Sequence, residues 1–178
     1  MDWTDDVWKE RYTLIYRCWL SRIYHQKRER FFDLADSLTK AITLIAGTAS
    51  IARVISPGGQ LIVGVIITIT SVLSLVIGYS KKARNHSDVA KAFMDIEAKI
   101  MTAGILTQEQ VDNFLAEILR VEMNEPRTLG ALMVICQNEI AEMQGEKTFI
   151  NPVTFVKRVT AHFIDWDMSC SHHRALTK

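Results

Sequence analysis

The chain has 178 residues, of which 48% are hydrophobic and 23% are charged, and its formal net charge is +1. This length fits one domain, or one domain with a short appendage, and the near-neutral charge argues against a general nucleic-acid binder. Three cysteines at wide spacing form neither a disulfide framework nor a CxxC motif, which predicts reduced thiols in the cytosol. The acidic first six residues lack the features of a cleavable signal peptide, so we expect membrane insertion to come from internal segments.

Residues 1–30 are predicted to form an N-terminal amphipathic helix. Its apolar stripe consists of Trp8, Tyr12, Ile15, Trp19 and Ile23, at helical spacing, and it is widened by Val7, Tyr16 and Leu20. Two interpretations remain open. The stripe packs on other cytoplasmic helices, or it lies in the lipid headgroup layer, where tryptophan and tyrosine are enriched.

Residues 31–82 are predicted to form a two-helix transmembrane hairpin. The uncharged part of the first helix, residues 41–52, is too short to span ~30 Å of hydrocarbon at 1.5 Å per residue. A span from about Leu34 to Ile55 is long enough if Lys40 and Arg53 extend toward opposite membrane surfaces. The sequence therefore supports this first crossing less strongly than the second.

The second crossing is predicted from the 19 uncharged residues 61–79, which follow a Ser56-Pro-Gly-Gly-Gln60 turn. The competing interpretation is a wholly buried core helix of a soluble bundle. Basic residues flank the hairpin on the side away from the turn, which by the positive-inside rule places both termini in the cytoplasm. The flanking basic residues include Lys27, Arg28, Arg30, Lys81, Lys82 and Arg84.

Residues 83–166 are predicted to be a cytoplasmic helical region, so the fold class is all-α. A helix continuing from the second crossing ends at Ala103-Gly104, and Thr107 to Gln110 has the form of a capping box before the next helix. Further helices are expected over residues 129–143 and after Asn151-Pro152. Residues 167–178 have no clear pattern and are expected to be a mobile tail.

Small and polar residues recur on one face of the second crossing. They are Gly64, Thr68, Ser71, Ser74 and Gly78, and Thr70 forms a second series with Ser74 and Gly78. In lipid such residues permit close helix packing and interhelical hydrogen bonds, which favours a homo-oligomer. The alternative is that part of this stripe lines a water-filled path.

Charged and titratable residues near the membrane have local and functional interpretations. Asp36 and Lys40 are spaced i,i+4 and can pair on one helix face, although Asp33 and Asp36 could also form a vestibule ring. His86 is a candidate switch, because histidine changes charge near neutral pH, or it forms local contacts that cap the membrane helix.

The sequence contains no recognisable catalytic motif. It has no Gly-rich phosphate loop, GxSxG or HExxH, so we expect no enzyme activity, no catalytic residue and no cofactor. Cys170, His172 and His173 could bind a metal in isolation, but their place in the expected tail argues against a metal site. Cys136 lies on an apolar helix face and is expected to be a buried small hydrophobe.

Four short motifs occur in a characteristic order along the chain. They are Tyr24-His25-Gln26-Lys27-Arg28 before the predicted hairpin, Ala83-Arg84-Asn85-His86 directly after it, and then Glu122…Glu125-Pro126 and Cys136-Gln137-Asn138-Glu139. In this order the motifs resemble the SLATT family, two-transmembrane effector proteins associated with bacterial SMODS nucleotidyltransferases and SLOG sensor domains. The resemblance covers roughly residues 15–165.

The resemblance implies a membrane effector of bacterial antiphage defence. Such a protein would oligomerise and permeabilise the inner membrane when a nucleotide signal or a partner protein activates it, causing abortive infection. The alternative is a membrane-anchored adaptor that recruits a cytoplasmic defence enzyme complex. In both cases the expected partners are the lipid bilayer and further protein, and not nucleic acid.

Overall fold

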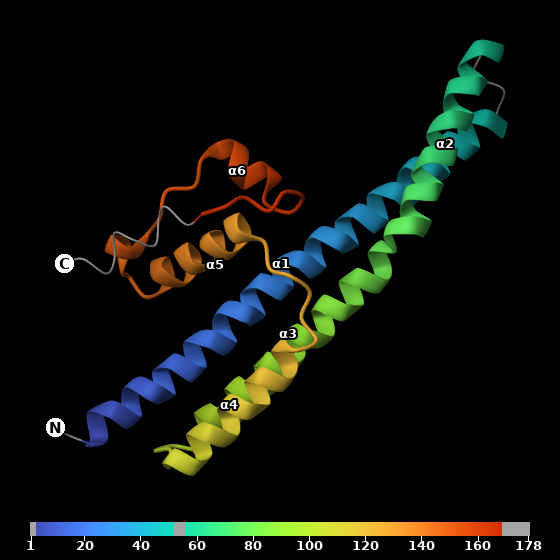
Figure 1. Ribbon diagram of the computed structural model, residues 1–178. Coiled ribbons are helices and arrows are strands. Elements are labelled where there is room, and N and C mark those ends of the chain that lie inside the picture. Colours follow the sequence, from blue (N-terminus) through green and yellow to red (C-terminus); the bar gives the residue numbers. More distant parts are fainter. Residues whose placement is uncertain (1–2, 52–55, 169–178) are drawn as a thin grey trace. The chain divides into compact units, whose positions relative to one another are not determined.

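A computed structural model describes residues 3–51 and 56–168, and all secondary structure in these ranges is helical (Figure 1). The predicted all-α class is therefore confirmed. The elements are α1 (Trp3–Ile51), α2 (Pro57–Ile77), α3 (Tyr79–Thr102), α4 (Gln108–Glu122), α5 (Gly130–Met143), the 3₁₀ helix η1 (Lys147–Phe149) and α6 (Phe155–Thr160). Of the expected tail, only Asp167 and Met168 belong to the described range.

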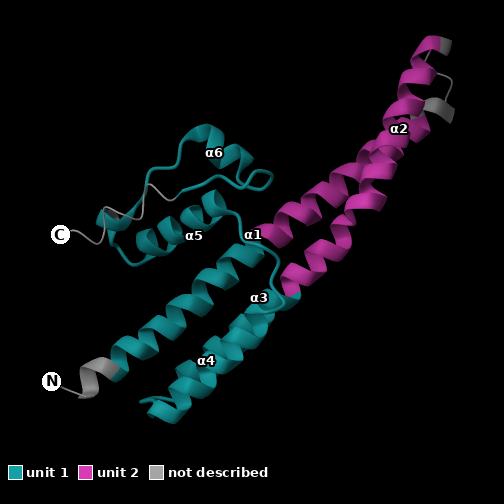
Figure 2. Ribbon diagram, viewed as in Figure 1, with its two compact units in different colours: residues 1–26, 88–178 teal, residues 27–87 magenta. Residues whose placement is uncertain are grey.

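The chain divides into two compact units, shown in Figure 2. We call residues 27–87 the hairpin unit, and residues 1–26 with 88–178 the helical unit. The sequence analysis treated the N-terminal helix as a separate region. In the structure its residues up to Gln26 share a unit with the C-terminal helices, because the start of α1 contributes side chains to their core.

The first core cluster of the helical unit joins α1, α3 and α4. Phe93, Ile96 and Ile100 are buried at helical spacing on α3, because this spacing gathers apolar side chains on one face. The other buried members are Leu14 and Cys18 of α1, Leu106, and Val111 and Ile118 of α4. Burying a large apolar side chain completely stabilises the fold by about 1.5–3 kcal/mol.

A second core cluster packs α1 against α5. Its buried members are Ile23, Tyr24, Ala131, Leu132, Cys136, Ile140 and Ala161. Cys136 is fully buried, as the sequence predicted. The start of α1 therefore contributes to two cores, so its buried residues do not follow a single stripe.

The predicted stripe of α1 is only partly correct. Ile23 is buried, and Ile15 and Trp19 pack against the cores, but Trp8 and Tyr12 are 51% and 52% exposed. Apolar spacing alone cannot show which residues find a neighbouring helix.

The predictions of helix ends from local sequence signals are confirmed more fully than the predicted stripe. The Thr107 hydroxyl accepts a hydrogen bond from the Gln110 N–H at 3.3 Å, and the Gln110 side chain accepts one from the Thr107 N–H at 2.9 Å, which confirms the capping box. Gly104, with φ 72°, follows the end of α3 where predicted. The last helix does form, but Phe155, Val159 and Phe163 on it and after it are largely exposed.

Candidate functional site

The most distinctive surface of the hairpin unit is the apolar helix α2. Its 21 residues carry no charge, and at 1.5 Å each they extend about 32 Å, close to the ~30 Å thickness of bilayer hydrocarbon. Among the described residues, only the helical stretch that begins with α2 is long and apolar enough to cross a membrane, and none of its apolar window is buried. The chain does not enclose this helix as a soluble core would.

Large apolar side chains of α2 are exposed along its length. Leu61 is 74% exposed, Leu75 85% and Val76 77%. Val63, Ile67 and Ser74 are half-buried, so the chain shields only part of this helix. Soluble proteins rarely expose so large a contiguous apolar surface unless something covers it.

The predicted small-residue face of α2 divides into two parts. Gly64, Thr68 and Ser71 are exposed, whereas Ser74 and Gly78 are partly covered. A Cβ built on Gly64 would meet no atom within 4 Å. The first three residues therefore remain available to another molecule.

Gly78 separates α2 from α3, where the sequence analysis expected one continuous helix. Its backbone is left-handed, with φ 63° and ψ 50°, and its N–H donates to the Ser74 carbonyl at 3.0 Å. Glycine adopts this conformation without the steric cost of a Cβ. The role of Gly78 is therefore a helix cap, in addition to any packing role.

The first predicted crossing belongs to α1, one helix of 49 residues. The Lys40 Nζ lies 2.6 Å from the Asp36 Oδ2, which confirms the predicted i,i+4 pair, and Asp33 is exposed. Arg53, which was expected to complete this crossing, lies outside the described residues. The two-pass topology remains a prediction.

The hydroxyls of Thr39, Thr43 and Thr68 donate to carbonyls of their own helices at 2.7, 2.9 and 2.8 Å. Such local bonds satisfy a hydroxyl in hydrocarbon without a partner helix or water. These threonines are therefore compatible with contact to lipid.

Aromatic and basic residues gather where α1 meets the start of α3 in the hairpin unit. Phe32 is buried, and its ring stacks on His86 with centroids 5.6 Å apart. The Arg28 guanidinium lies 4.5 Å and the Lys82 ammonium 5.7 Å from the Phe32 ring centroid. His86, only 5% exposed, is thus packed in this cluster.

The other predicted flanking cations lie outside this aromatic cluster. Arg84 contacts the Ser80 hydroxyl at 3.5 Å, Arg30 and Lys81 are exposed, and Lys27 is half-buried.

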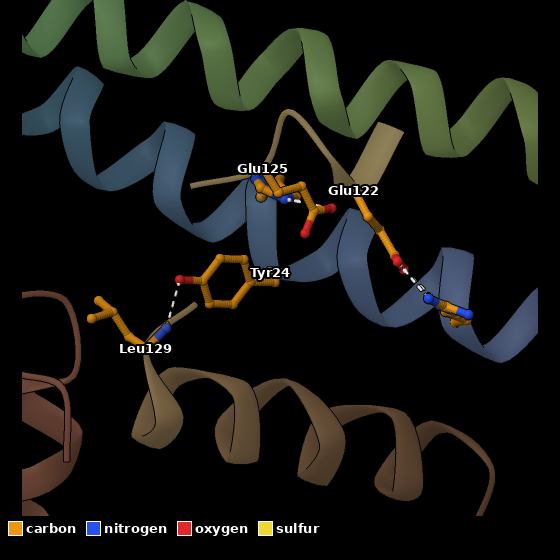
Figure 3. A network of polar contacts seen from close by, with 6 residues as sticks. Tyr24, Glu122, Glu125 and Leu129 are labelled. Carbon is orange, nitrogen blue, oxygen red and sulfur yellow. Dashed lines mark hydrogen bonds and ion pairs between the residues drawn. The ribbon is translucent and has the colours of Figure 1, made fainter. Parts of the chain in front are cut away.

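The helical unit contains a polar network, drawn in Figure 3, that links α1 to the end of α4 and the α4–α5 connection. The Arg17 Nε donates to the Glu122 carboxylate at 2.6 Å. The Leu129 N–H donates to the Tyr24 hydroxyl at 3.0 Å. These contacts join residues that are 105 positions apart in the chain.

The same region contains a buried histidine. The His25 side chain is fully buried, and its Nε2 lies 3.2 Å from the Glu125 Oε1. The ring also contacts Tyr24 edge-on and stacks with Phe93, at centroid distances of 5.3 and 6.4 Å. The motifs Tyr24-His25 and Glu122…Glu125 therefore meet in space, which the sequence analysis did not foresee.

Next to α5 lies a cavity of about 960 Å³ with a mixed lining. Aromatic residues such as Tyr12, Tyr16 and Trp166 line it together with charged residues, among which Arg127 forms an ion pair with Asp165 at 3.2 Å. Burial raises the pKa of the Tyr16 hydroxyl, with a smaller contribution from Tyr12.

Neither metal nor thiol chemistry is indicated in the described ranges. No group of three or more metal-ligating side chains occurs there, and Cys170, His172 and His173 lie outside them. Burial, and to a lesser extent the Glu97 charge, raise the pKa of the Cys18 thiol to about 12, so this thiol is not a nucleophile at neutral pH.

Comparison with protein-family models, with curated proteins and with solved structures finds no match to this chain.

Proposed function

We propose that this chain is a two-pass membrane protein, with the hairpin unit in the bilayer and the helical unit in the cytoplasm. The observation that carries this proposal is the uncovered apolar surface of α2, whose apolar window has no buried residue. Each large apolar side chain transferred from water to hydrocarbon gains about 1.5–3 kcal/mol, so a bilayer is the environment that stabilises this helix.

The flanking residues support the proposed orientation. Arg28, Arg30, Lys81, Lys82 and Arg84 all lie on the side of the hairpin away from the Ser56–Gln60 turn. Basic residues near the ends of short spans are retained on the cytoplasmic side. The resemblance to the SLATT family, which is bacterial, makes the inner membrane the expected location.

The proposed activity is that of an antiphage-defence effector, which permeabilises the inner membrane after a nucleotide signal or partner protein activates it. The exposed face of Gly64, Thr68 and Ser71 supports self-association, because these residues are accessible and small residues permit close helix approach. The defence role itself rests on the family resemblance.

Release of a dye from liposomes tests this activity. Purified full-length protein should release the dye when activated, and Gly64→Leu/Ser71→Leu should release much less, because two bulky side chains separate the associating helices. Val72→Leu is the matched control, since Val72 is exposed on the same helix and the change keeps it apolar. Absence of release under both resting and activated conditions would exclude a pore.

The second candidate is a membrane-anchored adaptor that recruits a cytoplasmic enzyme complex. One observation favours it: the Thr68 and Thr70 hydroxyls bond within their own helix, so α2 offers few groups to line a water-filled path. Leu119 on α4 is 46% exposed, and Met123, the residue that follows the end of α4, is 78% exposed. These two apolar side chains form a surface that a partner protein could contact. If Leu119→Ser/Met123→Ser abolishes phage protection while Gly64→Leu/Ser71→Leu preserves it, the adaptor is correct.

A further inference from the structure

A groove of about 760 Å³ runs along the hairpin unit between α1 and the helices α2 and α3. Lys81 and Arg84 line one part of it, hydroxyl groups line another, and Leu44 and Leu75 contribute apolar surface. The groove therefore combines cations, hydrogen-bond donors and apolar side chains in one continuous space.

The charges in this groove are unbalanced. Lys40, Lys81 and Arg84 face a single carboxylate, Asp36, and that carboxylate already pairs with Lys40 at 2.6 Å. Within the described part of the chain, no carboxylate lies within ion-pair distance of Lys81 or Arg84. Two cations are thus available to an anion.

The hydroxyl groups of the groove also fall into two sets: some already donate a hydrogen bond within the chain, and others do not. Thr39 and Thr43 donate to carbonyls of α1. Ser71 and Ser74 make no side-chain hydrogen bond among the described residues, although both line the groove. Their hydroxyls can donate to an oxygen-rich ligand, and the ester carbonyls of a lipid are acceptors.

We propose that this groove binds an anionic glycerophospholipid. Lys81 and Arg84 contact its phosphodiester. The Ser74 and Ser71 hydroxyls lie about 10 and 15 Å from Lys81 along the helix at 1.5 Å per residue, so they face the ester-linked part of the lipid. An acyl chain lies against Leu44 and Leu75. Basic pockets between membrane helices on the cytoplasmic side bind anionic headgroups in this way. A zwitterionic choline lipid fits less well, because its ammonium would approach the same two cations.

This inference rests on the proposed membrane location and specifies the lipid that the hairpin selects. Native mass spectrometry of the full-length protein in detergent tests it, with equal amounts of phosphatidylglycerol and phosphatidylcholine added. We expect one phosphatidylglycerol to be retained in preference. Equal retention of the two lipids would overturn the proposal.

The decisive variant is Lys81→Gln/Arg84→Gln. Each cation at a membrane surface contributes about fivefold to the binding of an anionic lipid, so losing both should weaken retention about 30-fold. Arg30→Gln/Lys82→Gln is the matched control: it removes two flanking charges from the same unit, but neither residue lines the groove. An equal loss of lipid retention in both variants would show that general charge attraction holds the lipid, and would refute specific binding in the groove.

A second pair of variants leaves the charge unchanged. Ser71→Trp should fill the groove and block lipid retention. Val72→Trp should not, because Val72 is exposed on the same helix and does not line the groove. Inorganic phosphate should not displace the lipid; displacement would identify a general anion site and contradict the proposal. Extraction of the wild-type protein by carbonate would instead overturn the membrane location, so the two failures are distinguishable.

Discussion

A lysine placed near the middle of α2 tests the membrane location most directly. Ile69 lies two residues from the centre of the helix and is 53% exposed, so Ile69→Lys places an ammonium in the hydrocarbon with little effect on contacts inside the chain. On the insertion scale, exchanging isoleucine for lysine at a helix centre costs about 3 kcal/mol. That corresponds to more than about a hundredfold change in the insertion equilibrium.

Val76→Lys is the matched control. Val76 is 77% exposed, and its Cα lies about 13 Å from the helix centre at 1.5 Å per residue. From there a lysine side chain reaches the interface with its ammonium in water, so the expected cost is small.

Carbonate extraction of cell membranes is the assay. The wild-type protein and Val76→Lys should remain in the membrane pellet, and Ile69→Lys should move to the soluble or degraded fraction. All four tryptophans have sequence positions in the helical unit, so the thermal transition of tryptophan fluorescence reports whether that unit stays folded. Soluble wild-type protein, or equal behaviour of the two lysine variants, would refute the reasoning.

Three further predictions concern the helical unit. Glu125→Ala should lower the unfolding free energy by about 2 kcal/mol in a denaturant titration, because it removes the carboxylate 3.2 Å from the fully buried His25; an unchanged midpoint would contradict this. Gly130→Ala places a Cβ 2.6 Å from the Trp166 carbonyl, so a cost of about 1–3 kcal/mol and faster proteolysis of the C-terminal segment are expected, and unaltered cleavage would argue against this contact. Burial raises the pKa of the Cys18 thiol to about 12, from 9.0 for an unperturbed thiol. The unfolded chain therefore loses this proton first as the pH rises, and the unfolding free energy should fall above pH 9 by up to about 1.4 kcal/mol per pH unit. In Cys18→Ala this dependence on pH should be weaker.

Local chemistry explains why some predictions held. The pairing of Asp36 with Lys40 needs only one helix and an i,i+4 spacing, and the Thr107 capping box needs only four residues. Gly104 ends α3 because glycine accepts a positive φ. Each of these signals lies within one turn of chain.

Tertiary contacts explain the failures. Tyr12 is exposed although it lies in the predicted stripe, and Leu14 and Cys18 are buried although they lie outside it, because α1 packs against two different partners. Which residues of α1 are buried cannot be read from spacing along a single helix.

Gly78 interrupts a segment that was predicted to be one continuous helix, and the reason is local. Its left-handed backbone and its hydrogen bond to the Ser74 carbonyl end α2, and the apolar composition of the segment did not mark it as a helix cap.

The sequence by itself determined the all-α class and the uncharged segment of α2, because composition and helical hydrogen bonding are local properties. Only the tertiary structure decided which side chains meet. It brought His25 to Glu125 across a hundred positions and left Gly64, Thr68 and Ser71 uncovered. It also placed Lys81, Arg84 and Ser71 along the same groove. Such juxtapositions depend on how the helices pack, and no local pattern in this chain encodes them.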